Sequence, residues 1–160
     1  MNHTNPATYE RARRFANLAV FAIALQCRRL NSVEPEDDAF VFRKWYDFEF
    51  LLLALIRLRR IAHQVASLPE ATVTVGTAIT AFEARLPGLK LMRDVAEHID
   101  DYALDNGRNR AVTKEILEVS TFAEDGPTLR WLGAELNAQQ ALVASEALFQ
   151  AIQQAASSFT

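Results

Sequence analysis

The sequence predicts an all-α protein, a bundle of about five helices with one β-hairpin inserted before the last helix. Apolar residues recur at the 3.6-residue period of an amphipathic helix over most of the chain. Only five glycines and five prolines interrupt its 160 residues, which favours long helices over many short strands. Between residues 114 and 136 the period changes to the alternation typical of a hairpin. Residues 1–160 are expected to form a single domain.

The first two helices are expected to end near residues 30 and 66. Asn5 is suited to cap the first, and Pro6 fits its first turn. The inward stripe of this helix is expected to contain Tyr9, Ala12, Ala16, Leu18 or Ala19, Ile23, Cys27 and Leu30. After the loop NSVEPEDD, Asp37 or Asp38 can cap a second helix from about residue 39. The second helix should form the centre of the core through its bulky residues, which are Phe40, Phe42, Trp45, Phe48, Leu52, Leu55, Ile56 and Ile61.

The middle of the chain predicts two further helices. Residues 70–86 contain VTV, which is typical of a strand, but also AITAFEARL, and the longer pattern favours a helix. Residues 89–104, LKLMRDVAEHIDDYAL, form the fourth predicted helix. Its inward stripe comprises Met92, Val95, Ile99 and Tyr102. The sequence Asp105-Asn106-Gly107 is a typical left-handed stop for this helix.

The hairpin and the last helix complete the predicted fold. EILEVSTFAEDGPTLRWLGAEL alternates apolar and polar residues on both sides of the turn sequence EDGP. Its expected packing residues are Val119, Phe122, Leu129 and Trp131. Asn137 and Gln140 resemble a capping box that starts a helix running to about residue 156. Its inward face is expected to contain Leu142, Ala144 or Ser145, Leu148, Phe149 and Ile152.

Composition narrows the classes of function. The net charge of −3 argues against a general nucleic-acid binder. The single cysteine, Cys27, excludes an internal disulfide, and its apolar neighbours predict a buried, inert thiol that suits the reducing cytoplasm. The apolar runs are shorter than a membrane span, so no membrane partner is expected. Glu10 in the leader, and the helical period that continues to Arg28, favour a helix over a signal peptide.

Several catalytic classes lack their motifs. The chain has no Glu-x-x-His, which a carboxylate-bridged di-iron bundle requires. It also has no Gly-x-Ser-x-Gly and no glycine-rich phosphate loop. We therefore expect no metal site and no cofactor.

One cluster on the fourth predicted helix has the residues for phosphodiester chemistry. Asp94 and His98 stand four residues apart and share a face, whereas Arg93 and His98 are about 140° apart and flank it. Cleavage by an RNA 2′-hydroxyl needs a group that titrates near neutral pH and a fixed positive charge. Histidine and arginine supply these without a metal.

The run RDVAEH from Arg93 to His98 resembles the R-x4–6-H motif of the HEPN superfamily. These are small, mostly helical proteins, often dimeric, and many are metal-independent ribonucleases. The resemblance implies that Arg93 binds the scissile phosphate, His98 acts as general base or acid, and Asp94 orients the site. It also implies a homodimer in which two motifs face each other. Arg108 and Arg110 would neutralise nearby aspartates and bind RNA. A toxin or defence role would add a cognate inhibitor protein as partner.

The sequence offers a second match to this motif, from Arg57 to His63. Leu58 follows its arginine where the family prefers a polar residue, so Arg93…His98 ranks first. The chain also departs from the toxin subgroup, which has tyrosine two positions after the histidine, where this chain has Asp100.

The alternative is a non-catalytic helical dimer that acts through protein–protein interaction. In that case Arg93 forms an ordinary ion pair with Glu97, four residues on, and His98 lies against the bundle. Catalysis instead requires the side chains of Arg93 and His98 to be exposed and to converge in one cleft. The two hypotheses therefore differ in an observable geometry.

Overall fold

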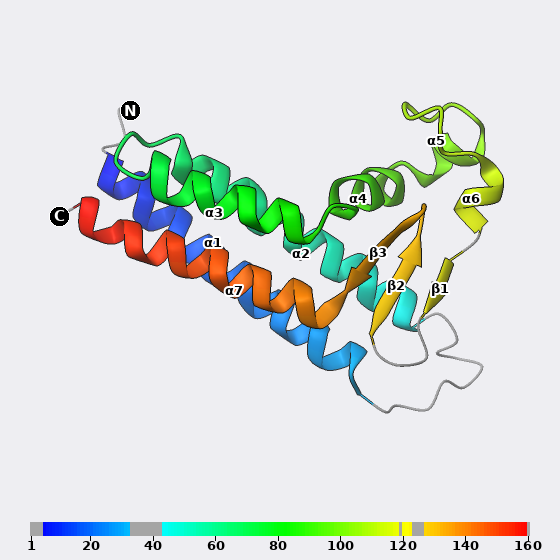
Figure 1. The fold of residues 1–160 in the computed structure, drawn as a ribbon, viewed down its shortest axis with the longest axis horizontal. Coiled ribbons are helices and arrows are strands. Elements are labelled where there is room, and N and C mark those ends of the chain that lie inside the picture. The colour runs from blue at the N-terminus through cyan, green and yellow to red at the C-terminus, as the bar shows by residue number, and fades with distance from the viewer. Residues whose placement is uncertain (1–4, 33–42, 119, 123–126, 160) are drawn as a thin grey trace.

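The computed structural model describes residues 5–32, 43–118, 120–122 and 127–159. Within these ranges an elongated bundle is formed by α1 (Asn5–Leu30), α2 (Arg43–Ala66), α3 (Thr72–Arg85) and α7 (Ala138–Gln154). A short 3₁₀ helix, Ala155–Ser158, follows α7. Helix α1 starts and α7 ends at the same end of the bundle (Figure 1). The other end carries α4 (Leu89–Glu97), α5 (Ile99–Ala103), α6 (Lys114–Glu118), β1 (Ser120–Phe122), β2 (Thr128–Trp131) and β3 (Ala134–Asn137).

This architecture confirms the predicted fold class, since the chain is mainly helical and its small sheet lies before the last helix. The stretch VTV belongs to helix α3, as the longer helical pattern predicted. Asn137 caps α7, and its side-chain oxygen accepts a hydrogen bond from the backbone N–H of Gln140 at 2.9 Å. Phe40, Phe42 and the two expected caps of the second helix lie outside the described residues.

Helix α1 packs into the bundle through small side chains. Ala12, Ala16 and Ala19 are buried on its inward face, and Leu18 is exposed, which decides between the two expected core positions. Small residues let neighbouring helices approach closely, so α1 can contact both α2 and α7 along its length. The hydroxyl of Tyr9 donates a hydrogen bond of 2.7 Å to the carbonyl of Ile152, which fastens α1 to the end of α7.

A buried carboxylate joins α1 to α2. Asp47 is 1% exposed, and its Oδ1 accepts a hydrogen bond of 2.7 Å from Nε of Arg29 on α1. Nη1 of Arg43 lies 3.5 Å from the other oxygen and donates a 3.0 Å hydrogen bond to the carbonyl of Arg29. Removing one partner of a buried ion pair costs about 3–5 kcal/mol. The interaction therefore fixes the antiparallel register of the two helices.

The predicted hairpin is confirmed and forms part of a three-stranded antiparallel sheet in the order β1-β2-β3. Its first predicted residues, Lys114–Glu118, form the short helix α6 instead of a strand. A second, unexpected turn joins β2 to β3 through Leu132 and Gly133, whose φ angles are 55° and 72°. Two consecutive positive φ angles fit the two-residue hairpin turn whose twist matches that of the strands. Leu129 and Trp131 are buried as predicted, whereas Val119 lies outside the described residues.

The sheet is held against the helices by close contacts. The Trp131 ring meets Trp45 of α2 edge-on, with 4.9 Å between ring centroids, and its Nε1 donates to the carbonyl of Leu117 at 3.1 Å. A Cβ atom added at Gly88, just before α4, would lie 2.5 Å from Cβ of Ala134 in β3. The start of α4 therefore approaches β3 so closely that only glycine fits there.

The fourth predicted helix is not continuous, which corrects one expectation from the sequence. It breaks at His98, where φ is −125° and ψ is 32°, and continues as α5. Asp100 and Asp101 then lie in the first turn of a new helix, where carboxylates are favourable. Because of the break, Ile99 is exposed and not part of the core stripe. Met92, Val95 and Tyr102 are buried as expected.

The contact between Gly88 and Ala134 predicts opposite effects for two glycine substitutions. Gly88→Ala should lower the free energy of unfolding by about 1–3 kcal/mol, because the added methyl group overpacks the junction. Gly76→Ala, inside α3 with no atom within 4 Å of the added Cβ, should raise it by about 0.5–1 kcal/mol. Urea denaturation of both variants measures these changes. Equal effects of the two substitutions would contradict the close approach.

Candidate functional site

Arg93 of the predicted motif lies against α2. Its side chain is 19% exposed and lines a hollow of about 100 Å³ between α2 and α4. The hollow is lined by Glu49, Leu52, Leu53, Arg93, Ala96 and Glu97. The guanidinium forms an ion pair with Glu97, four residues on in the same helix. Asp94 is further away, with its carboxylate oxygen 4.0 Å from Nη1 of Arg93. This is the ion pair that the non-catalytic hypothesis predicted.

The surroundings of the hollow destabilise the charged forms of two ionisable side chains that line it. Burial lowers the pKa of Arg93, and the nearby guanidinium of Arg60 lowers it further. The Nε of Arg93 is buried and has no hydrogen-bond partner. Burial also raises the pKa of Glu49, against the effect of a hydrogen bond from Trp45. The hollow therefore favours an uncharged occupant.

His98 occupies a different environment. It stands at the break between α4 and α5 with a side chain 46% exposed, and its Nδ1 lies 3.9 Å from a carboxylate oxygen of Asp101. It does not line the hollow beside Arg93. Among the described residues no hydrogen bond or ion pair joins Arg93 to His98. His98 is therefore exposed, as catalysis requires, but it does not share the hollow that Arg93 lines.

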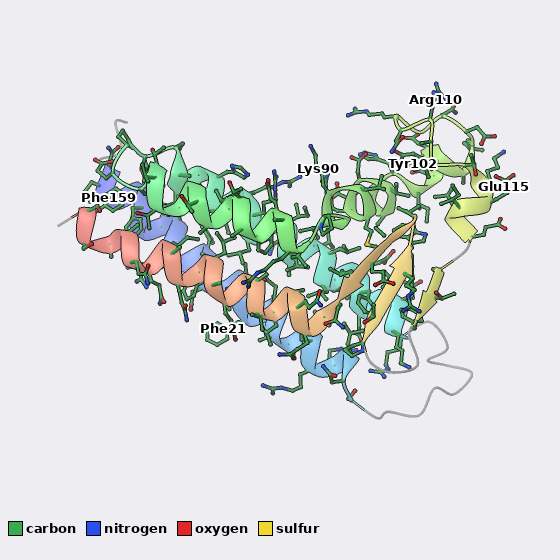
Figure 2. All side chains as sticks on the ribbon, viewed as in Figure 1. Phe21, Lys90, Tyr102, Arg110, Glu115 and Phe159 are labelled. Atoms are coloured by element: carbon green, nitrogen blue, oxygen red, sulfur yellow. The ribbon has the colours of Figure 1, made fainter. Side chains whose placement is uncertain are left out.

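The arginines expected to bind RNA lie beyond α5. Arg110 projects from the loop between α5 and α6, at the edge of the molecule in Figure 2. Its Nη1 donates a hydrogen bond of 2.8 Å to the carbonyl of Asp105. Arg108 is exposed in the same loop. This loop is fixed from inside, because Gly107 packs against the ring of Tyr102 and the Tyr102 hydroxyl accepts from the backbone N–H of Asn109.

The second match to the motif belongs to an ion-pair network between α2 and α3. Nε of Arg59 donates to Glu83 at 2.6 Å, and His63 lies 3.5 Å from the same carboxylate oxygen. Burial tends to raise the pKa of Glu83, but Arg59 and His63 together hold it below the ordinary value. His63 thus has a structural role in this network, and Arg57 is exposed on another side of α2.

A feature that the sequence reasoning missed is the apolar outward face of α1. Phe15, Leu18, Phe21 and Leu25, which we call the α1 face, are each between 51 and 65% exposed. Phe21 projects away from the bundle (Figure 2). The signal was present, because the helix carries a second apolar stripe beside its core stripe. Helix α2 adds a shorter row, Tyr46, Phe50 and Leu53, which we call the α2 strip and which is 46–56% exposed.

Other classes of site find no support among the described residues. In those parts of the chain, no three histidine, cysteine, aspartate or glutamate side chains gather where they could hold a metal ion. Across the same residues, no helix has both the length and the apolar character needed to cross a bilayer. Burial raises the pKa of Cys27 to about 11, and its Sγ donates to the carbonyl of Ala138, so the thiol is inert as predicted.

Comparison with protein families, with curated proteins and with solved structures finds no match for this chain. The resemblance to HEPN proteins therefore depends on the Arg93…His98 motif and the helical architecture alone.

The partly buried position of Glu49 predicts a pH-dependent stability difference. A carboxyl group with a raised pKa in the folded state binds its proton more tightly there, so stability falls as the pH rises through its pKa. Glu49→Gln removes this ionisation and keeps an acceptor for Trp45. We expect the variant to be more stable than the wild type at pH 7, and the gain to disappear below the ordinary glutamate pKa of 4.5. Urea denaturation at both pH values measures it, and a gain independent of pH would contradict the assignment.

Proposed function

We propose that this protein is a non-catalytic helical protein that acts by binding another protein chain through the α1 face. The observation that carries this proposal is the row of four large apolar side chains that α1 exposes to solvent. Scattered apolar residues are normal on a protein surface, but a contiguous apolar patch on a folded chain marks an interaction site. A homodimer, as expected from the sequence, is one form that such binding can take.

The geometry of Arg93 supports the same proposal. A phosphate-binding arginine needs a guanidinium that is open to its ligand, with donors in a free fork. Arg93 instead pairs with Glu97 and lines a small hollow that the carboxyl group of Glu49 also lines. A phosphate at this position would have to displace one carboxylate and approach a second.

Site-specific photo-crosslinking tests the interaction. We expect p-benzoylphenylalanine at Phe21 to give a covalent protein adduct in irradiated cells, with the chain produced in the cytoplasm that its sequence favours. The same amino acid at Val143, which is similarly exposed on α7, should give at least tenfold less, because no apolar row surrounds it. Equal yields at the two positions, or no adduct at Phe21, would contradict the proposal. An adduct with a second copy identifies the homodimer.

The second candidate is the metal-independent endoribonuclease. The observation in its favour is that His98 is half-exposed beside Asp101, an arrangement in which a carboxylate can orient an imidazole for proton transfer. In this candidate the arginine that meets His98 would come from the opposite copy of a homodimer, as in the HEPN proteins that the motif resembles. Arg108 and Arg110 would then contact the RNA.

Incubation of a mixed RNA pool with purified protein in EDTA separates the two candidates. We expect the RNA to remain intact, because Arg93 is paired within its own helix. Cleavage that Arg93→Ala and His98→Ala both abolish, and that the matched exposed-histidine variant His63→Ala retains, would instead establish the ribonuclease. Circular dichroism of all three variants verifies that they are folded.

A further inference from the structure

We propose that the α1 face and the α2 strip together bind an amphipathic helix of a partner protein whose apolar stripe is flanked by acidic residues. This inference rests on the proposed function and names the partner of that same site. It requires that the two rows form one surface, that this surface has the area of a protein interface, and that its charge selects an acidic ligand.

The register of α1 and α2 brings one end of each row to the same level. Arg29 and Asp47 are paired, and both helices rise by about 1.5 Å per residue. Leu25, four residues before Arg29, therefore lies near the level of Leu51, four residues after Asp47. Phe50 is adjacent to that level.

The directions of the side chains place the two rows on the same side. At about 100° per residue, Leu18 and Leu25 point within about 40° of Arg29, which reaches toward α2. On α2, Phe50 points about 60° from Asp47, which faces α1. Leu53 lies a further 60° round and lines the hollow beside α4. The α2 strip therefore lies between α1 and α4 and borders the α1 face.

The combined surface has the size of a protein interface. It consists of seven large apolar side chains, each roughly half-exposed: Phe15, Leu18, Phe21, Leu25, Tyr46, Phe50 and Leu53. Aromatic side chains each present about 150–250 Å² when fully exposed. The exposed apolar area is therefore several hundred Å², which approaches the roughly 800 Å² per partner of a standard interface.

A hollow at the edge of this surface offers an anchor point. Leu53 belongs both to the α2 strip and to the hollow of about 100 Å³ between α2 and α4. A space of this size holds one apolar side chain of a partner helix. Such a buried anchor commonly contributes much of the affinity of a helix bound to a protein surface.

The two helices that carry this surface have an excess of basic residues. Helices α1 and α2 contain ten basic residues, five in each, against Glu10, Asp47 and Glu49, whereas the whole chain has a net charge of −3. Two exposed arginines lie beyond each row on its own helix: Arg11 and Arg28 at the two ends of the α1 face, and Arg57 and Arg60 after the α2 strip. In the described ranges no carboxylate pairs with these four arginines. Carboxylates of a partner would complement them.

The same charges disfavour a second copy as the occupant. Arginines stand at both ends of the α1 face, so two copies related by a twofold axis bring arginine ends together whether their α1 helices run parallel or antiparallel. Like charges that meet at an interface oppose association. Nucleic acid would satisfy the arginines but would leave Leu18, Leu25 and Leu53 without an apolar partner. An acidic amphipathic helix can pair with the arginines and also cover the apolar side chains.

Binding of synthetic peptides to the full chain tests the inference. One fluorescent three-heptad peptide carries leucine at its a and d positions and glutamate around them, and its matched control carries lysine in place of glutamate. By fluorescence anisotropy we expect the glutamate peptide to bind at least tenfold more tightly, with an affinity that falls as salt is added. Equal binding of the two peptides would overturn the inference.

Two sets of variants assign the binding to the surface. Leu18→Asp with Phe50→Asp should weaken binding of the glutamate peptide at least tenfold, whereas Val143→Asp on α7 should leave it unchanged. Arg57→Glu with Arg60→Glu should remove the preference for the glutamate peptide, because the two new carboxylates offset Arg11 and Arg28. Both targeted pairs are exposed, so the variants should remain folded, which circular dichroism verifies. Binding that neither pair alters would overturn the assignment to this surface.

Three further outcomes identify a different occupant and overturn the inference. These are a dimer in solution, binding to phosphatidylserine vesicles, or binding to a polyuridine RNA, in each case lost with Leu18→Asp and Phe50→Asp. A photo-adduct at Phe21 without preference for the glutamate peptide would leave the proposed function standing and defeat only the choice of partner. Absence of that adduct would defeat the proposed function itself.

Discussion

The carboxylate of Asp47 is the interaction on which the rest of this structure depends. It is shielded from solvent and sits between guanidinium groups from two helices, Arg29 of α1 and Arg43 of α2. Sliding one helix along the other by a single turn would separate this buried carboxylate from Arg29 and leave it with Arg43 alone, which is more costly than losing a fully exposed pair. Helices α3, α4 and α7 pack against α1 or α2, so the register set at Asp47 reaches nearly every element. It also brings the α1 face and the α2 strip together.

The two faces of α1 differ in the side chains that they carry. Three of the seven buried residues of α1 are alanines, which let α2 and α7 approach closely but supply little apolar area for each residue buried. Four large apolar side chains of the helix, two phenylalanines and two leucines, point outward. Close packing inside and a broad apolar surface outside are thus two consequences of one pattern. The Arg93 region has the opposite character, because its charges are paired within α4 and its hollow is small.

The fold was largely predictable from the sequence, and the failures have identifiable physical causes. Helical period, the cap at Asn137, and the alternation around EDGP located the long helices and the hairpin. The break at His98 could not be predicted because the helical period of residues 89–104 continues across it, and only the structure shows that Asp100 and Asp101 start α5. The pairing of Arg93 with Glu97 follows from their spacing, but the position of Arg93 in a hollow against α2 depends on tertiary packing that no local pattern contains. The α1 face was missed because two apolar stripes on one helix satisfy the same period, and only their packing shows which is buried.

The contact between Tyr9 and Ile152 ties the first helix of the bundle to the last, across more than 140 residues of sequence. Helix α7 begins 108 residues after α1 ends, so at ordinary rates of synthesis α1 waits roughly 5–20 s for it. During that time the inward face of α1 lacks its contacts with α7, and the α1 face is exposed as well. Both apolar sides of α1 are then open to other chains at once. The nascent chain therefore exposes more apolar surface than the folded protein does, so its association with other chains is more favourable during synthesis than after folding.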